Sequence, residues 1–336
     1  MKKINYLLAA ALFIAAGCDK SPVDQGTTDD GNLYMQFSVK MLSTRSTTDN
    51  TGGSNSNADP DTEVGLAKEN TISTVDIALV KDDQYYVAKN VTPSSASADT
   101  YVASFSTLDL TAGAKYKVYI YANCSAPAAF NVDEVSEATI AEMTADNKFW
   151  MTNAYSATEV TLPSDLAPYT QPNTPLSLGA HTVERSMARF DYKQAGAFDM
   201  GAGITLTLTD AALINQSKAH YMFRRVTADA NTTSAITVGG AEIPTNWVVD
   251  TDWSSKTPAG FDAQLEAPST WTWTKLASLT TDDQYTGDYK IWCYAKENTI
   301  PGIDAQKHNV STGVVFKAEL AAGATASAAV KDAMAA

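Results

Sequence analysis

The chain has 336 residues, of which 44% are hydrophobic and 18% are charged, and its formal net charge is −14. A chain of this length and composition can fold as two ordinary domains. Its negative charge repels phosphate backbones and the sequence contains no basic stripe, so the composition argues against a nucleic-acid partner.

The first residues have the layout of an export signal. Lys2 and Lys3 precede an apolar run over residues 6–16, which is too short to span a bilayer. Small residues then lead to Cys18, and polar residues follow it. This arrangement resembles a bacterial lipobox, so we expect residues 1–17 to be a lipoprotein signal peptide and Cys18 to carry the lipid. The alternative is an ordinary signal peptide followed by an unrelated cysteine.

The first predicted strand covers residues 33–41. Apolar and polar side chains alternate along it, which is the pattern of a half-buried strand. The apolar row consists of Leu33, Met35, Phe37, Val39 and Met41. Arg45 follows this strand, and Ser46 begins a run dominated by Ser, Thr, Asn, Asp and Gly. Such a composition cannot form a packed core, so residues 46–61 are predicted to be a disordered polar tether.

Most of the remaining chain alternates with a period of two, as short strands separated by polar loops do. The pattern occurs in residues 73–80, 116–124, 188–192, 203–210, 288–295 and 313–320. Helix signals are confined to residues 131–143, with Asn131 as the expected N-cap, and to the Ala-rich residues 323–336. The sequence therefore predicts an all-β fold of antiparallel β-sandwiches with minor helix content.

One stretch with four prolines, residues 162–184, has no sustained period. Prolines do not pair in central strands, and linkers between domains are often rich in proline. We therefore place a domain boundary in this stretch. Residues 62–175 are predicted to form an N-terminal β-sandwich domain, and residues 176–336 a C-terminal one.

The sequence offers little for catalysis. His181, His220 and His308 are scattered, and none lies in a metalloprotease or nucleophile-elbow motif. The acidic pairs Asp82–Asp83 and Asp282–Asp283 lack the spacing of a calcium loop, and we interpret them as turns. We therefore expect a protein that is not an enzyme and uses no cofactor and no metal.

Two further features leave alternatives open. Cys124 and Cys293 can form a disulfide in an oxidising compartment, although their neighbours favour two buried cysteines on separate strands. Trp271 and Trp273 fall on the same face of a strand. They either stack against a glycan or fill the core of the second domain, and we favour the core.

Several segments, in this order, resemble the fimbrillin family of Bacteroidia, the subunits of type V pili, and most of all its minor-fimbrium branch. These segments extend over residues 1–320. They are the lipobox at Cys18, the first strand with its STR ending, YKVYIYANC, NKFWMTNA, ERSMARFDY, INQSKAHYMF, CYAKENT and QKHNVSTGVVFKAEL.

The resemblance implies a fold and a route of maturation. Members of the family have two transthyretin-like β-sandwich domains, reach the outer-membrane surface as lipoproteins, and are cut by an arginine-specific protease. By position, the cut falls between Arg45 and Ser46, which makes residues 18–45 a propeptide with a removable strand. The implied partners are other fimbrial subunits, the protease, the outer membrane before maturation, and host or bacterial surface ligands.

The resulting hypothesis is a structural subunit of surface fimbriae, polymerised by donor-strand exchange. Loss of strand 33–41 opens a groove, and a neighbour's strand fills it. The alternative is a permanently anchored surface lipoprotein that binds glycan or serves as an accessory or anchor adhesin. Members of the family end in a donated strand, whereas no alternating strand follows Leu320 here. The chain is therefore expected either to be truncated or to accept a strand without donating one.

Overall fold

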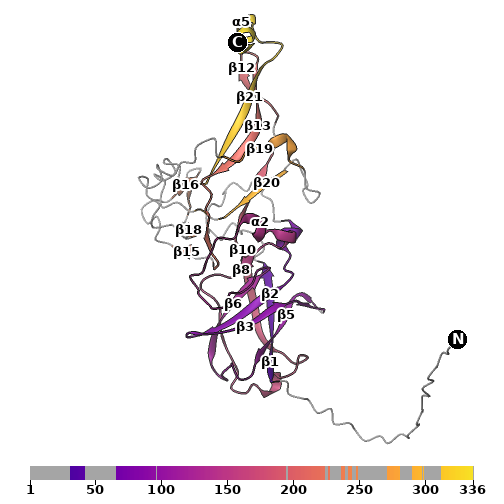
Figure 1. The fold of residues 1–336 in the computed structure, drawn as a ribbon, viewed down its shortest axis with the longest axis vertical. Coiled ribbons are helices and arrows are strands. Elements are labelled where there is room, and N and C mark those ends of the chain that lie inside the picture. Colours follow the sequence, from indigo (N-terminus) through magenta and orange to yellow (C-terminus); the bar gives the residue numbers. More distant parts are fainter. Residues whose placement is uncertain are drawn as a thin grey trace, which may run out of the picture.

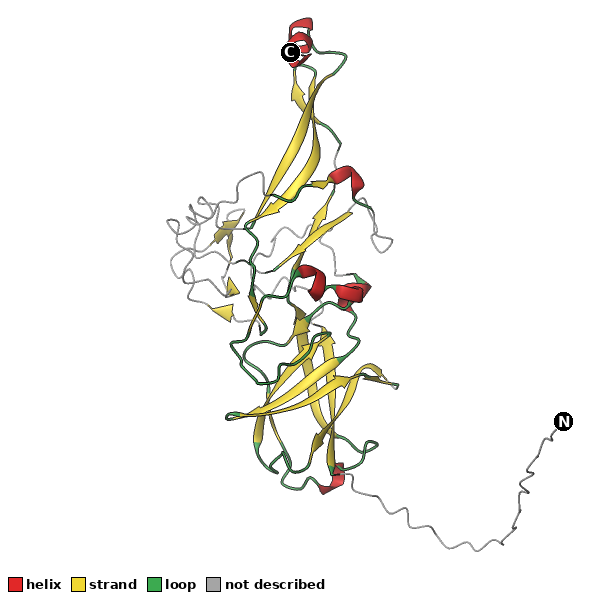
Figure 2. Ribbon diagram, in the orientation of Figure 1, coloured by secondary structure: helices red, strands yellow, loops and turns green. Residues whose placement is uncertain are grey.

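The computed structural model describes residues 31–41, 66–95, 97–193, 196–223, 271–280, 290–296, 298 and 312–335, and the backbone of four short strands between residues 226 and 248. This part of the molecule is elongated and consists mostly of strands (Figure 1), with few helical segments (Figure 2). The helices are α1 (Ala67–Asn70), α2 (Ile140–Met143), α5 (Ala328–Ala335) and the short 3-10 helices η1 (Ala145–Asn147), η2 (Ala167–Tyr169) and η7 (Leu276–Ser278). The predicted all-β fold is confirmed.

The largest sheet has nine described strands, in the order β3-β2-β6-β8-β10-β1-β5-β4, with β9 also paired to β6. Their bounds are β1 (Asn32–Met41), β2 (Val75–Lys81), β3 (Gln84–Val91), β4 (Pro93–Ser94), β5 (Ser97–Ser106), β6 (Lys115–Ala122), β8 (Met151–Thr152), β9 (Glu159–Thr161) and β10 (Leu176–Arg185). Predicted strands therefore lie where β1, β2 and β6 are observed.

The main core lies where the inward rows of β1 and β5 meet those of β2 and β6. Ile77 and Leu79 of β2 are fully buried in it, as are Val118 and Ile120 of β6. The opposite face of β2 is also covered, because aromatic residues from elsewhere in the chain pack over it and over β6. Burial on both faces explains why β2 is mostly apolar rather than strictly alternating.

The described part of the C-terminal half contains four smaller sheets, and its longer strands form two of them. β11 (Ala188–Tyr192) pairs with β20 (Lys290–Ala295). β13 (Ile204–Ile214) pairs with β12 (Phe198–Gly201), β19 (Thr274–Lys275) and β21 (Gly313–Ala322). The long strands β13 and β21 form, with β12, a ribbon that projects from the upper part of the molecule in Figure 1. The other short strands are β7 (Val135–Ser136), β14 (His220–Tyr221), β15 (Val226–Thr227), β16 (Ile236–Val238), β17 (Ala241–Ile243) and β18 (Trp247–Val248).

The two halves of the chain are packed together by side chains from the second half. Phe223 is fully buried against Tyr119 and Tyr121 of β6, with ring centroids 4.7 Å and 5.0 Å away. The hydroxyl of Thr152 donates a hydrogen bond to the carbonyl of Met222. Residues just after β14 therefore complete the outer cover of the first sheet.

β10 differs most from the sequence-based expectation. The boundary at residue 176 assigned this strand to the second domain, but β10 pairs with both β1 and β8 in the first sheet. The four prolines of the supposed linker all precede β10 in the chain, with Pro175 immediately before it. Gly179, with φ of +84°, lies at a register shift that interrupts the alternation. The β1–β10 pair is parallel, whereas an antiparallel arrangement was expected.

The predicted helix over residues 131–143 is mostly wrong. Only α2 is helical there, because Val135 and Ser136 form β7 and pair with β14. The N-cap is Thr139 rather than Asn131. Its hydroxyl accepts a hydrogen bond from the Glu142 N–H (3.3 Å), while the Thr139 N–H donates to the Glu142 carboxylate (2.6 Å). This reciprocal capping box fixes the start of the helix. The predicted C-terminal helix is observed as α5.

Candidate functional site

β1 is the central candidate because it is held on both sides. It pairs in parallel with β10 over Met35–Met41 and antiparallel with β5 over Asn32–Ser38. Both backbone edges of β1 are therefore used in the sheet. We call the space that β1 fills between β10 and β5 the β1 slot; its removal would leave unpaired N–H and C=O groups along both neighbouring strands.

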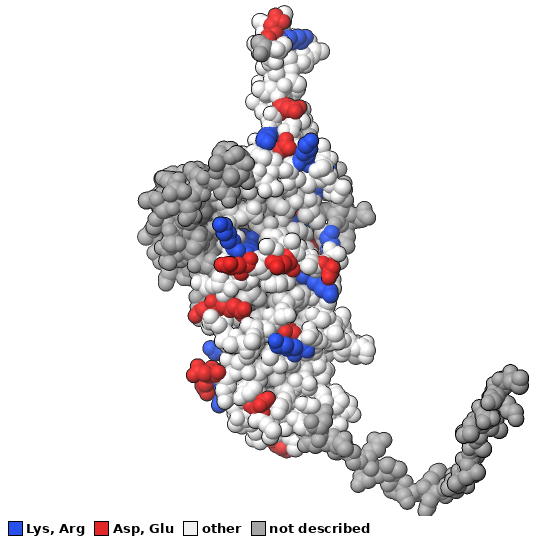
Figure 3. Space-filling model, viewed as in Figure 1, with Lys and Arg blue, Asp and Glu red and all other residues white. Residues whose placement is uncertain are grey.

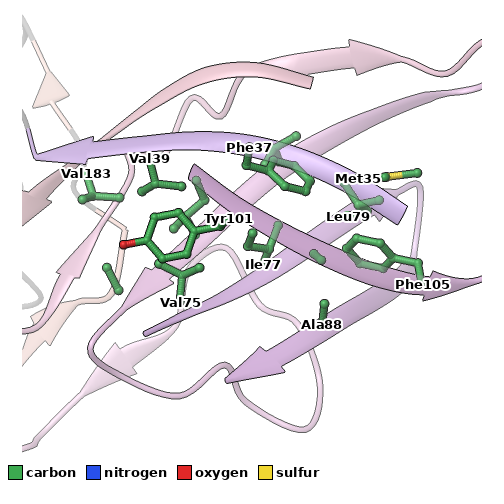
Figure 4. Close-up of a cluster of buried hydrophobic side chains, with 14 of the residues drawn as sticks. Met35, Phe37, Val39, Val75, Ile77, Leu79, Ala88, Tyr101, Phe105 and Val183 are labelled. Atoms are coloured by element: carbon green, nitrogen blue, oxygen red, sulfur yellow. The ribbon is translucent and has the colours of Figure 1, made fainter. Parts of the chain in front are cut away.

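The inward row of β1 is the predicted one. Leu33, Met35, Phe37 and Val39 are at most 1% exposed, and Met41 is partly buried and packs against the same core. Alternation places these side chains on one face, where they meet a complementary layer. Figure 4 shows Met35, Phe37 and Val39 of β1 in one cluster with buried side chains of β5 and β2.

The β1 slot is lined by apolar and aromatic side chains from distant parts of the chain. Phe37 lies opposite Tyr101, and Leu33 lies opposite Phe105, both on β5. Met41 lies opposite Val183 on β10. Tyr101 is fully buried, and its hydroxyl donates a hydrogen bond to the carbonyl of Ile72 (3.2 Å).

The energy of seating β1 is substantial. Full burial of a side chain of this kind is worth about 1.5 to 3 kcal/mol, so the four fully buried positions represent, as an upper bound, roughly 6 to 12 kcal/mol. Contacts at the ends add less. Lys40 and Asp99 form an ion pair of 3.6 Å in which both side chains are more than half exposed, and such pairs contribute little. Among the side-chain contacts, apolar burial therefore contributes most to holding β1.

The β1 strand begins beside a turn of the main sheet. Thr107 donates hydrogen bonds to the carbonyl of Gly31 from its N–H (2.8 Å) and from its hydroxyl (3.0 Å). The predicted lipid site Cys18 and the predicted cut between Arg45 and Ser46 lie outside the described residues. The structure therefore describes β1 but not the residues at which the predicted lipid and the predicted cut lie.

A buried charged cluster lies where the described chain resumes after β1. Glu69 of α1 is fully buried, and its carboxylate accepts hydrogen bonds from the Leu66 N–H (2.8 Å) and the Tyr294 hydroxyl (2.7 Å). It also binds Nη1 of Arg185 at 3.0 Å and Nη1 of Arg189 at 2.5 Å. We call these five residues the Glu69 cluster. It joins α1 to β10, β11 and β20.

The electrostatics of the Glu69 cluster favour the carboxylate. Burial alone would raise the pKa of Glu69, but the hydrogen bonds from Arg189 and Tyr294 and the positive charge of Arg189 outweigh this effect, so its pKa lies below the ordinary value. Charge-assisted hydrogen bonds of this kind are the strong ones. The cluster therefore fixes the segment that follows the predicted tether. Sequence reasoning missed it, because no local pattern around Glu69 indicates burial.

The two predicted glycan-stacking residues do lie together. The ring centroids of Trp271 and Trp273 are 5.8 Å apart, with planes inclined by 57°, and both side chains are partly exposed. The ammonium group of Lys317 lies 4.0 Å from the ring centroid of Trp273. One face of Trp273 is therefore already occupied by a cation, and the fuller burial expected of a core pair is not observed.

The cysteines and the acidic turn have ordinary structural roles. Cys124 and Cys293 are free thiols, each of intermediate exposure; Cys293 lies on β20 as expected, whereas Cys124 follows the end of β6. Burial raises the pKa of both thiols, that of Cys293 to about 12, which disfavours the reactive thiolate. Asp82 and Asp83 form the predicted turn, between β2 and β3, and Asp82 has a φ of +52°. Asp282 and Asp283 lie outside the described residues.

Residues that commonly bind metals do not cluster in the described part of the chain. His181 lies on β10 and His220 on β14, and both are buried, while His308 is outside the described part. Within that part, no group of three or more His, Cys, Asp or Glu side chains is placed to hold a metal ion. The described helices also include none long and apolar enough to cross a membrane.

Comparisons with known proteins show only weak similarity. No protein-family model and no curated protein matches the chain. Among solved structures, a fimbrial assembly protein from Parabacteroides distasonis is similar at 9% identity and a TM-score of 0.30, with 85% of each chain covered. A proposed adhesin from Bacteroides ovatus is similar at 12% identity and a TM-score of 0.29; the match covers 57% of this chain and spans 57% of the adhesin's length.

Proposed function

We propose that this chain is a structural subunit of a surface fimbria, exported as a lipoprotein through Cys18 and activated by a cut after Arg45. In this proposal β1 is a provisional strand that a neighbouring subunit replaces by donor-strand exchange. The observation that carries the proposal is the position of β1. It is a central strand with a buried inward row and it precedes all other described elements, so a single cut behind it separates it from the rest of the fold.

Cutting would convert a covalent strand into a bound peptide. Until then, β1 is tethered and rebinds immediately after any opening, because the tether keeps its local concentration high. After the cut, apolar burial and backbone pairing alone hold β1, and another strand of the same pattern can compete for the β1 slot. The protease then acts as the assembly switch, and the arginine at the strand–tether junction is where it acts.

A donor strand must offer an alternating apolar row, and β21 has one. Val314, Phe316, Ala318 and Leu320 share a face by alternation, and all four are exposed. β21 pairs only with β13 among the described strands, so it would have to leave that one partner to pair with both β10 and β5 of a neighbour's β1 slot. We therefore assign the donor role to β21 rather than to a strand beyond Leu320, where α5 is observed instead.

The positions of the two strands suit a filament. β1 lies toward one end of the elongated molecule and β21 toward the other (Figure 1). The visible surface of the ribbon around β21 is a narrow, mostly uncharged projection (Figure 3). A head-to-tail contact between a ribbon and a β1 slot is heterologous, and repetition of such a contact builds an open filament.

The test is controlled cleavage of the purified chain with an arginine-specific protease. N-terminal sequencing should give Ser46 as the first residue of the main product, and mild-detergent electrophoresis should then show a ladder of multimers. The Arg45→Ala variant should keep β1 and stay monomeric under the same treatment. A different first residue, or a product that has lost β1 yet stays monomeric and binds no hydrophobic reporter dye, would contradict the proposal.

A second candidate is an anchored surface lipoprotein that binds glycan. It is favoured by one observation, the neighbouring and partly exposed rings of Trp271 and Trp273. Because Lys317 covers Trp273, the platform would consist mainly of Trp271. The Trp271→Ala variant should then lose retention on a glycan array while its unfolding curve is unchanged. Absence of glycan binding, or binding that survives the substitution, would remove this candidate.

A further inference from the structure

A buried histidine lies beside β1, on the strand that pairs with it. His181 of β10 is opposite Val39 and is 4% exposed. Its ring centroid is 5.8 Å from that of Phe37, with the two planes inclined by 49°. Neither ring nitrogen has a well-aligned hydrogen-bond partner in the described part of the chain. Buried polar groups are nearly always paired, so an imidazole in this position requires an explanation.

The groups packed around His181 supply no compensating charge. On β1, Lys40 is largely exposed and is paired with Asp99 of β5, which is itself more than half exposed. The titratable residue of β5 that faces the core is Tyr101, and burial together with the charge of Asp99 raises its pKa to about 12, so it is neutral. On η2, the phenol Tyr169 packs against the same core.

The rest of β10 and its other partner strand, β8, also supply no counter-charge for His181. Glu184 and Arg185 lie at the far end of this strand, where Arg185 is held by Glu69. β8 contributes Met151 and Thr152, neither of which titrates. A proton added to His181 would therefore place a positive charge among apolar side chains without a counter-charge, which is strongly disfavoured.

We propose that His181 makes the seating of β1 depend on protons, so that acidification favours opening of the β1 slot. The neutral imidazole packs beside Phe37 and Val39. The charged form requires water, which it reaches when β1 leaves the slot. This regulation rests on the proposed function for its use, since opening of the slot precedes assembly there. The coupling itself is a property of the uncut chain.

The direction of the pH effect follows from the pKa of His181 when β1 is seated and when the slot is open. Burial lowers the pKa of His181 below its ordinary value while β1 is seated, and the backbone of Leu178 offsets part of this effect. In the open slot the imidazole is expected to return to a pKa of about 6.5. The open state then binds more protons between these two values. The contribution of neutral His181 to seating is complete above about pH 6.5 and is lost as the pH falls toward the lowered pKa.

The experiment is hydrogen exchange of the backbone amides of β1 in the uncut full chain between pH 7.5 and pH 5. After correction for intrinsic exchange, the equilibrium constant for opening should rise by up to about tenfold for each pH unit below 6.5. The His181→Leu variant should show an opening constant that does not change with pH. The matched control is His220→Leu, because His220 is equally buried but lies on β14, which pairs with β7 and not with β1. This control should retain the wild-type pH dependence.

A wild-type opening constant that does not change with pH would overturn the proposal, as would a His181→Leu chain that keeps the change. If that variant does not fold, an NMR titration of the wild-type imidazole decides the matter. A His181 ring that titrates near pH 6.5 while β1 remains protected contradicts the proposal, and a ring that stays neutral until β1 exchange accelerates supports it. Because the chain is uncut throughout, its failure to form multimers after cleavage would not affect either result.

Discussion

β1 and β21 are both ten-residue strands with one alternating apolar row, yet their surroundings are opposite. β1 is paired on both edges, and its row is buried, with Phe37 fully inaccessible. β21 is paired on one edge among the described strands, and Phe316 and Leu320 are 45% and 57% exposed. The comparison shows that alternation specifies a strand with an apolar face. Whether that face is buried depends on the other strands that pack over it.

The difference lies in what packs over each strand. The row of β1 meets β2 and β6, which are themselves rich in apolar residues. The row of β21 continues across the ribbon, where Leu320 is opposite Leu206 and Leu206 is opposite Phe198. Phe198 is also 48% exposed, so no described layer covers this face. An exposed row of this length is typical of an interaction surface.

The largest expected difference is between two phenylalanine truncations. Phe37→Ala should lower the free energy of unfolding by about 3 to 5 kcal/mol, because it leaves a cavity in the main core. Phe316→Ala should lower it by less than about 1 kcal/mol, since that ring remains largely in water. Urea unfolding of the two variants measures both values. Equal losses would break the comparison, because they would mean that β21 is packed as tightly as β1.

The next effect concerns the Glu69 cluster, which fixes the chain where it re-enters the fold after β1. Glu69→Gln should lower the free energy of unfolding at pH 7 by about 1.5 to 3 kcal/mol, because it removes the charge that binds two arginines. The pKa of Glu69 is lowered in the folded state. The Glu69 carboxylate therefore adds its full share to the free energy of unfolding when the pH is above its pKa in the unfolded chain. This share is lost as the pH falls through its pKa in the folded chain.

Unfolding curves of wild type and Glu69→Gln should accordingly differ at pH 7 and converge well below pH 4. The matched control is Asp99→Asn, because Asp99 forms an exposed ion pair with Lys40. This control should change stability by less than about 1 kcal/mol at either pH. A difference between wild type and Glu69→Gln that persists unchanged in acid would show that packing, rather than charge, gives Glu69 its role.

A smaller effect on stability, with a large effect on assembly, is expected in β21. Leu320→Asp should change the free energy of unfolding by less than about 0.5 kcal/mol, because the side chain is exposed. It should nevertheless abolish the multimer ladder of the cut chain, since a buried charge in the β1 slot would have no partner. Glu319→Ser, on the opposite face of the same strand, is the control and should assemble normally. Normal ladders from Leu320→Asp would exclude β21 as the donor.

The smallest effect is expected at the edge of β1. Lys40→Ala removes the exposed ion pair with Asp99 and should cost at most a few tenths of a kcal/mol, and added salt should erase the loss. Thermal unfolding at low and high ionic strength measures this. A larger loss that salt does not erase would mean that the side chain of Lys40 does more than form an exposed ion pair, which would contradict this prediction.

The parts of the fold that the sequence predicts are those with a local signal. β1, β11 and β21 lie where alternating residues were recognised, because alternation needs only a few consecutive positions. The same local reasoning identified the five inward residues of β1. It also identified the turn at Asp82 and Asp83.

The parts that escaped prediction depend on distant partners. β10 was mistaken for a linker because prolines precede it and Gly179 interrupts its period, and only pairing with β1 and β8 makes it a strand. Glu69 is buried because Arg185, Arg189 and Tyr294 converge on it from more than a hundred residues away. His181 was interpreted as an isolated histidine, and its position beside Phe37 follows only from the register of β10. Such contacts leave no local trace in one sequence.

The measurement that tests the central claim most directly is native mass spectrometry of the chain after it is cut behind Arg45. The cut monomer should retain the fragment that contains β1, because apolar burial holds it. Each subunit–subunit junction in a multimer should lack one copy of this fragment, because a neighbour's strand has taken its place. Multimers in which every subunit still carries its β1 fragment would contradict the account.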